Sequence, residues 1–153
     1  MDNSKPHARN LRSARVSEPG RIYLITCVTH QRNNVFSDWH CGRLLVQALM
    51  KEHQRAQTLA YVVMPDHLHW LMQLKNNATL GGLVRAVKGV SSWQVNKVLN
   101  RSGRLWQAGF HDHALREEED IVATARYLVA NPLRAGLVQR IGDYPLWDAV
   151  WLE

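Results

Sequence analysis

The first half of the chain alternates between strand-like and helix-like patterns of apolar residues. The run RIYLITCVTH, from Arg21 to His30, is rich in β-branched and aromatic residues and predicts a strand. Apolar residues then recur at helical spacing, which predicts a helix that is capped by Ser37 or Asp38 and runs to about Arg55. The segments TLAYVVM and HLHWLMQL, separated by a Pro-Asp turn, predict two strands that lie side by side.

The second half repeats this order and adds one helix. After the loop KNNAT, apolar positions predict a helix from about Thr79 to Gly103, which its internal glycines are expected to delay or make irregular. The run RLWQAGFHDHALR alternates like a fourth strand. REEEDIVATARYLVANP predicts a further helix, with acidic residues at its positive end and Pro132 at its end. The segment LRAGLV and a tail with two tryptophans, YPLWDAVWLE, are expected to fold back on the body.

This order, β-α-β-β-α-β followed by one helix, predicts an α+β fold of the ferredoxin-like, split β-α-β type. In such a fold an antiparallel sheet carries two helices on one face, and strand four pairs with strand one. The additional C-terminal helix is the natural cover for the other face. We expect residues 1–20 to form a basic flexible arm and residues 21–153 to form a single domain with a C-terminal tail.

Basic residues are concentrated in two parts of the chain. The formal net charge is +6, and no Asp or Glu occurs between His67 and His111. Such asymmetry is typical of a protein that binds a polyanion, because neutralising phosphates releases counterions. A basic surface that only confers solubility is the alternative. The cations of this interval are Lys75, Arg85, Lys88, Lys97, Arg101 and Arg104, and those of the arm region are Lys5, Arg9, Arg12, Arg15 and Arg21.

The chain has no apolar run long enough to span a membrane, and its polar, basic N-terminus does not look like a secretory signal. We therefore expect a cytoplasmic protein. Cys27 and Cys41 fit no metal-ligand spacing and are too few for a disulfide framework. Both are expected to be small buried residues.

Two histidines occupy alternate positions of the predicted third strand. Successive side chains of a strand point to opposite faces, so His67 and His69 share one face while Leu68 and Trp70 share the other. Two residues along a strand span about 6.5 to 7 Å, a distance from which two imidazoles can converge on one ion. Two solvated histidines are the alternative, and Trp70 is expected to lie in the core.

A second such pair, His111 and His113, lies on the predicted fourth strand. Strands three and four flank strand one in a ferredoxin-like sheet, so direct convergence of all four histidines is not expected. We interpret His113 as a candidate neighbour of the site and His111 as solvated or structural.

The final helix carries polar residues on one stripe, formed by Asp120, Thr124, Tyr127 and Asn131. Tyr127 and Asn131 lie four residues apart and could point together toward whatever the first histidine pair holds. Each has a simpler interpretation: Tyr127 can be half-buried in the core, and Asn131 can cap a short helix that Pro132 begins.

Several segments together resemble the REP-associated tyrosine transposases, within the single-tyrosine superfamily of His-hydrophobic-His (HUH) nucleases. They are ARVSEPGRIYLITCVTHQRNNVF, YVVMPDHLHWLM, LVRAVKGVSSWQVN, LWQAGFHDHALREEED and ARYLVANPLRAGLV. The resemblance implies that His67 and His69 bind Mg²⁺ or Mn²⁺, with Asn131 at the third ligand position, where the superfamily often has Gln. It also implies that Tyr127 attacks a DNA phosphate and forms a 5′-phosphotyrosine.

The resemblance further implies a bacterial, nucleoid-associated enzyme that cleaves and rejoins single-stranded DNA at REP hairpins, which carry a tetranucleotide on their 5′ side. A monomer is expected, with a dimer as the alternative. The residues predicted to contact DNA are Arg85, Lys88 and Lys97 on the basic helix and Arg9, Arg12 and Arg15 on the arm.

Two other functions are open at this point. A catalytically weak protein could bind REP hairpins in genome organisation or regulation. Alternatively, a ferredoxin-like sheet could bind RNA through aromatic residues on its open face, but strand three carries histidines there. Trp93 and Trp106 are open between core packing and base stacking.

Overall fold

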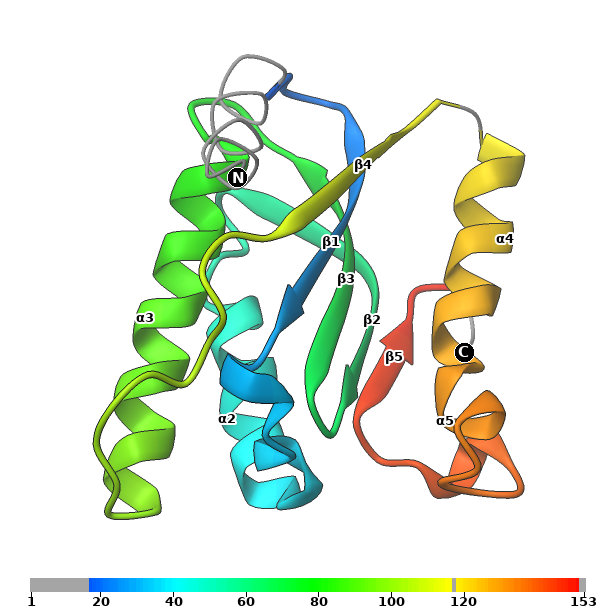
Figure 1. The fold of residues 1–153 in the computed structure, drawn as a ribbon. Coiled ribbons are helices and arrows are strands. Elements are labelled where there is room, and N and C mark those ends of the chain that lie inside the picture. The colour runs from blue at the N-terminus through cyan, green and yellow to red at the C-terminus, as the bar shows by residue number, and fades with distance from the viewer. Residues whose placement is uncertain (1–16, 117, 152–153) are drawn as a thin grey trace, which may run out of the picture.

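The computed structural model describes residues 17–116 and 118–151 of the chain. The strands and helices follow the predicted order, with one further strand near the C-terminus (Figure 1). Arg9, Arg12 and Arg15, together with most of the predicted arm, lie outside the described residues. The elements are β1 Ile22–Val28, η1 His30–Arg32, η2 Val35–Ser37, α2 Trp39–Met50, β2 Ala56–Met64, β3 His67–Leu74, α3 Leu80–Val98, β4 His111–Leu115, α4 Glu118–Val129, α5 Asn131–Arg134, η3 Ile141–Asp143 and β5 Trp147–Ala149.

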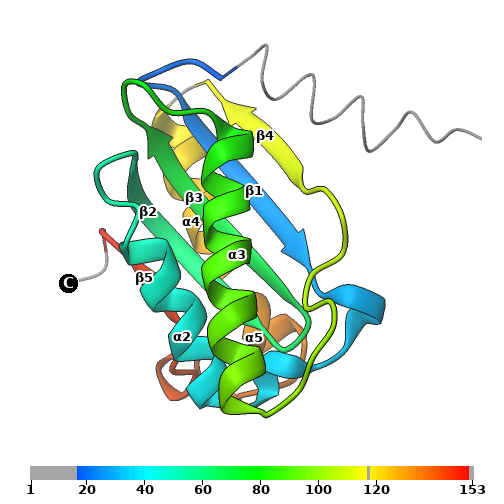
Figure 2. The same ribbon diagram turned by 90° about the vertical axis from the view of Figure 1, so that its left-hand side faces the viewer.

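The strands form one sheet in the order β4-β1-β3-β2-β5, and every neighbouring pair is antiparallel. Helices α2 and α3 lie on one side of this sheet, whereas α4 and α5 lie on the other side (Figures 1 and 2). The α+β, ferredoxin-like prediction is confirmed, including the pairing of the fourth strand with the first.

The sheet turns alternate side chains toward the two layers of helices. In β1, Tyr23, Ile25 and Cys27 are buried, and their register places them beside Met72, Trp70 and Leu68 of β3. Trp70 is only 1% exposed, and its Nε1 donates to the Thr58 hydroxyl, so the core prediction for this tryptophan is confirmed.

Both predicted helix starts are confirmed by side-chain caps. The Asp38 carboxylate accepts from His40 N at the start of α2, and the Thr79 hydroxyl accepts from Gly82 N at the start of α3. Helix α2 ends at Met50 and not near Arg55, because the following residues form turns that lead into β2. Helix α3 is continuous in spite of its glycines, because its apolar face is buried and tertiary packing outweighs their low helix propensity.

The predicted fourth strand was too long. Only His111–Leu115 pair with β1, whereas residues 104–110 cross the end of α3 as a loop. Trp106 of this loop is buried, and its Nε1 donates to the Ser91 hydroxyl on α3 over 3.0 Å. The alternation of apolar residues there therefore comes from contacts with a helix, and Trp106 belongs to the core.

The C-terminal tail folds back on the body, as expected, and adds the short strand β5 to the free edge of β2. Val63 N donates to Leu146 O, and the Tyr144 hydroxyl donates to Val63 O. Burial raises the pKa of Tyr144 to about 12, so this hydroxyl keeps its proton.

Both cysteines are buried and unpaired, which confirms their predicted place in the core. Burial is the main cause that raises the pKa of Cys27 to about 11, so this thiol stays protonated. In the part of the chain that the structure describes, none of the helices has the length and apolarity needed to cross a membrane.

Candidate active site

His67 and His69 lie on β3 and face away from α2 and α3. Their register partners on β1 are Val28 and Thr26, whereas the intervening Leu68 is fully buried against the opposite layer. The two imidazole rings have centroids 4.8 Å apart and an interplanar angle of 77°. The alternation predicted from the sequence therefore brings the two rings together on one face.

Each ring is held through its Nδ1 atom. His67 Nδ1 lies 2.8 Å from Asp66 Oδ1, and His69 Nδ1 lies 2.9 Å from the Thr26 hydroxyl. A carboxylate only accepts, so His67 carries a proton on Nδ1, and the neutral form of this ring has its lone pair on Nε2. In the tautomer that carries its proton on Nδ1, His69 donates to the Thr26 hydroxyl and its Nε2 is free in the same way. Such partners are typical of histidines that bind a metal through the other nitrogen.

The electrostatic environment keeps His69 neutral. The pKa of His69 is lowered to about 4, mainly by burial and to a smaller extent by the charges of His67 and Arg134. At neutral pH the ring is therefore uncharged, as a metal-binding imidazole must be.

Asp66 accepts from two cationic or protonated groups. Besides His67 it accepts from Arg32 Nη1 over 3.0 Å. Burial raises the pKa of Asp66, but the hydrogen bonds and charges of His67 and Arg32 outweigh that effect and hold the pKa below its usual value. Asp66 is thus an ionised carboxylate that orients His67, a role that the sequence analysis missed although Asp66 directly precedes the histidine motif.

Tyr127 lies on α4 and is 68% exposed. It lines a hollow of about 610 Å³ between α4 and the β1–β4 edge of the sheet, together with Leu24, His113, Leu115, Asp120, Ala123 and Thr124. The half-buried core position considered for Tyr127 is therefore wrong. The predicted stripe of Asp120, Thr124 and Tyr127 shares one hollow with His113.

His111 occupies a different position from the one that its pairing with His113 suggests. The register aligns His69, Thr26 and His111 in one row across three strands, whereas His113 aligns with Leu24. His111 is exposed, in agreement with its predicted solvation.

Arg134 connects the nucleophile candidate with the predicted third ligand. Its guanidinium carbon lies 3.7 Å from the centroid of the Tyr127 ring, and its Nη2 donates to Asn131 Oδ1 over 3.2 Å. The sequence analysis quoted Arg134 within NPLRAGL but gave it no role. Its position seven residues after Tyr127 and three after Asn131 is the helical spacing that could have indicated one.

Asn131 does not cap the short helix that contains Pro132. Helix α5 begins at Asn131 itself, its cap position is Ala130, and no side chain makes a cap hydrogen bond there. The side-chain oxygen of Asn131 accepts from Arg134 instead.

The residues at this face fit an open site for a divalent cation. Over residues 17–116 and 118–151, no group of three or more His, Cys, Asp or Glu could hold a metal ion. An ion here could use the two free Nε2 atoms and the amide oxygen of Asn131, so water or a phosphate would have to supply its other ligands. Such an incomplete ligand set suits catalysis better than a purely structural ion.

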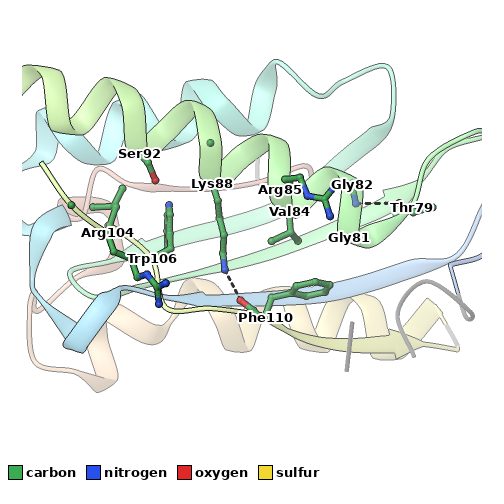
Figure 3. A pocket seen from close by; sticks show the side chains of 14 residues that line it. Thr79, Gly81, Gly82, Val84, Arg85, Lys88, Ser92, Arg104, Trp106 and Phe110 are labelled. Carbon is green, nitrogen blue, oxygen red and sulfur yellow. Dashed lines mark hydrogen bonds between the residues drawn. The ribbon is translucent and has the colours of Figure 1, made fainter. Parts of the chain in front are cut away.

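The opposite side of the sheet carries a basic groove between α3 and the 103–110 segment (Figure 3). Its volume is about 680 Å³, and Arg85, Lys88 and Arg104 line it without any acidic residue. Lys88 Nζ donates to Gln107 O over 2.8 Å and to Gly109 O over 2.5 Å, so two of its three hydrogens are used within the chain. Burial is the main cause that lowers the pKa of Lys88.

The outer face of α3 adds an exposed aromatic residue. Trp93 is 65% exposed, and Lys97 Nζ lies 4.8 Å from its ring centroid. Arg85, Gly89, Trp93 and Lys97 recur every four residues and so share one side of the helix. DNA contacts by Arg85, Lys88 and Lys97 stay predictions, and Lys88 is the one of the three that has a structural role.

The known proteins that this chain resembles in sequence are all of one class. A family model described as "Transposase IS200 like" matches residues 20–131. A Haemophilus influenzae protein named among the REP-associated tyrosine transposases is 29% identical over 137 residues, which cover 82% of this chain and 78% of that protein. An Escherichia coli REP-associated tyrosine transposase is 27% identical over 89 residues, which cover 56% of this chain and 50% of that protein.

The fold has a solved counterpart. The structure of a REP-associated tyrosine transposase bound to a REP hairpin superposes with a TM-score of 0.71 at 23% identity, and the match covers 86% of this chain and 78% of the other. The resemblance recognised from the sequence is thus confirmed in both sequence and fold. Because the family model covers most of the chain, this protein belongs to the IS200-like family of transposases.

Proposed function

We propose that this transposase cleaves and rejoins single-stranded DNA at REP-type hairpins, with a divalent metal and with Tyr127 as the nucleophile. One observation carries the proposal: His67 and His69 lie together with their Nδ1 atoms occupied, and the charge of Arg134 acts on His69 while its guanidinium stacks on Tyr127. A hydrolytic nuclease would have no need of an exposed tyrosine that stacks on an arginine near its histidines.

The roles of the residues follow from their donor atoms. His67, His69 and Asn131 would hold Mg²⁺ or Mn²⁺, which supplies Lewis-acid stabilisation of the scissile phosphate. The Tyr127 hydroxyl oxygen would bond to phosphorus while the bond from phosphorus to the 3′ oxygen breaks. The phenol loses its proton, and the 3′ oxygen takes one up and leaves as a hydroxyl. The resulting 5′-phosphotyrosine keeps the energy of the phosphodiester, so a second 3′-hydroxyl can reverse the step and rejoin the strand.

The opposite, basic side of the molecule would hold the hairpin stem. Arg85, Arg104 and Lys97 offer charge for phosphates, and exposed Trp93 offers a face on which an unpaired base can stack. A solved relative of the same fold is described as bound to a REP hairpin, which supports this class of ligand. A chromosomal repeat as substrate agrees with the expected cytoplasmic, nucleoid-associated location.

The test uses hairpin DNA that is labelled at its 3′ end, because the fragment on the 3′ side of the cut carries the phosphate. Purified protein is mixed with this DNA and Mn²⁺, Mg²⁺ or EDTA, and the products are separated on a denaturing gel. We expect a labelled covalent adduct with either metal and none with EDTA. Tyr127→Phe and His67→Ala should abolish it, whereas His53→Ala, a change at an exposed histidine, should not.

Two outcomes would contradict the proposal. An adduct that persists in Tyr127→Phe would require another nucleophile. Hairpin binding without cleavage under any metal would identify a DNA-binding protein of the same fold that has lost strand transfer.

A further inference from the structure

Among the residues that the structure describes, Arg134 is the cation that contacts the predicted nucleophile. Its guanidinium carbon lies 3.7 Å from the Tyr127 ring centroid, and it lies close enough to His69 for its charge to act on that imidazole. Both Arg134 and Tyr127 are exposed, so the stacked pair is open to a ligand from solvent. An arginine in this position places a fixed positive charge over the tyrosine ring and within electrostatic reach of His69.

Most of the hydrogen-bonding capacity of this guanidinium is unused. A guanidinium has five N–H donors. The hydrogen bond recorded for Arg134 runs from Nη2 to Asn131 Oδ1 at 3.2 Å, a long contact with a neutral amide. Within the described ranges, none of the ion pairs includes Arg134, so no carboxylate neutralises it there.

We propose that Arg134 binds the scissile phosphate of the DNA beside Tyr127 and is a further catalytic residue of this site. A phosphodiester is anionic, and its two non-bridging oxygens can accept from two donors of the guanidinium fork. The negative charge on the phosphoryl oxygens is also present in the transition state, where a fixed cation stabilises it. This inference rests on the proposed function, because it assigns a role at the same site.

The stacking of Arg134 on Tyr127 would place a bound phosphate near the attacking oxygen. A cation over an aromatic ring is attracted to the ring face, so the ring and the guanidinium hold each other in place. A phosphate held by the free edge of the guanidinium would lie close to the ring that carries the attacking oxygen. The same guanidinium donates to Asn131, so it also contacts the residue that is predicted to be the third metal ligand.

The simpler interpretation is that Arg134 is a structural clip that keeps Tyr127 and Asn131 in place. The two roles predict opposite effects on metal binding in the absence of DNA. A clip that positions Asn131 would help the ion to bind, so its removal would weaken binding. A free cation near the site repels a divalent ion, so its removal should leave metal affinity unchanged or higher.

The experiment compares wild type, Arg134→Gln and Arg134→Lys with the control Arg126→Gln. Arg126 is exposed on α4, the helix that carries Tyr127, but lines a different hollow, with Val122 and Trp151. Each protein is titrated with two hairpin DNAs, one that includes the nucleotides on both sides of the cut and one that stops before the scissile phosphate. Binding of Mn²⁺ without DNA is measured by calorimetry, and adduct formation is resolved into KM and kcat.

In wild type, the DNA that includes the scissile phosphate should bind more tightly than the DNA that stops before it. Arg134→Gln should reduce the ratio of these two affinities by roughly 10- to 100-fold. Adduct formation should fall by a similar factor or more, with partial recovery in Arg134→Lys, while Mn²⁺ affinity does not fall. Equal binding of the long DNA by wild type and Arg134→Gln would overturn the proposal, and so would a parallel fall in Mn²⁺ affinity. If wild type forms no adduct, the proposed function fails, but the comparison of the two DNAs still decides whether Arg134 binds the phosphate.

Discussion

Asp66 Oδ1 lies 2.8 Å from Nδ1 of His67, and the other oxygen of the same carboxylate accepts from Arg32. The loop that supplies Arg32 has an uncommon backbone, since Gln31 and Arg32 have φ angles of 54° and 51°. Residues other than glycine adopt such angles at a cost of about 1 kcal/mol or more, usually where the surrounding structure requires them. The strained turn therefore delivers a cation to the carboxylate that orients His67.

The first prediction follows from this contact. In Asp66→Ala, His67 loses the acceptor that fixes its Nδ1 proton, and Arg32 loses its partner. Removing such an outer partner of a metal-binding histidine typically weakens metal binding by about 10- to 100-fold. Calorimetric titration with Mn²⁺ measures the effect. Asp143→Ala, at a surface pair with Arg140, is the matched control and should bind Mn²⁺ as wild type does; equal affinities of both variants would refute the role of Asp66.

A second prediction concerns the partner of His69. Thr26→Val keeps the shape of the side chain but removes the hydroxyl that faces His69 Nδ1 at 2.9 Å. We expect weaker Mn²⁺ binding, with recovery in Thr26→Ser, because the imidazole loses the hydrogen bond that directs its Nε2 outward. Thr58→Val is the control, since it removes a different half-buried hydroxyl, the acceptor of Trp70 Nε1. That variant should lose stability without losing metal affinity, and a loss of affinity in both would point to general disruption.

A third prediction concerns acid stability without metal. Burial and nearby positive charge lower the pKa of His69 from 6.5 to about 4, so between these values the unfolded chain binds the extra proton. The free energy of unfolding should therefore fall as the pH drops from about 6.5 to about 4, by at most about 3 kcal/mol from this residue. Urea unfolding in EDTA at several pH values measures it.

The comparison of variants isolates the contribution of His69. His69→Gln should have a flatter stability profile over this range than wild type. His40→Gln, a change at an exposed histidine at the start of α2, should keep the wild-type profile. Parallel profiles for wild type and His69→Gln would mean that another group causes any loss in acid.

The periodic parts of the structure could be predicted from the sequence because each follows a local rule. The alternation in HLHWLMQL fixes which side chains of β3 face the helices, so the shared face of His67 and His69 was predictable. The three-residue strand β5 could not be predicted in the same way. It is too short for a pattern and forms only because β2 presents a free edge to the returning tail.

The same distinction applies to the site. Tyr127 and Asn131 were indicated by helical spacing and by the resemblance to a known family. Asp66 and Arg134 were missed, since an acid in a tight turn and an arginine after a proline have ordinary local roles. Their importance appears only when the register of β3 and the path of α4 into α5 bring them to the histidines and the tyrosine.

The last prediction separates structure from DNA binding on α3. Lys88 Nζ donates to the carbonyls of Gln107 and Gly109, so it ties the 103–110 segment to the helix. Figure 3 shows Lys88 extending from α3 toward this segment. Lys88→Met removes the donor of both carbonyls, of which that of Gly109 is part-buried, and should lower the free energy of unfolding by about 1 kcal/mol. Arg85→Gln, on the same groove but with its charge free for a ligand, should leave stability nearly unchanged and weaken hairpin binding, most strongly at low salt. Urea unfolding and hairpin titrations of both variants test this division.

If Lys88→Met is as stable as wild type and loses as much DNA affinity as Arg85→Gln, then Lys88 contacts the phosphates and its internal hydrogen bonds break when DNA binds.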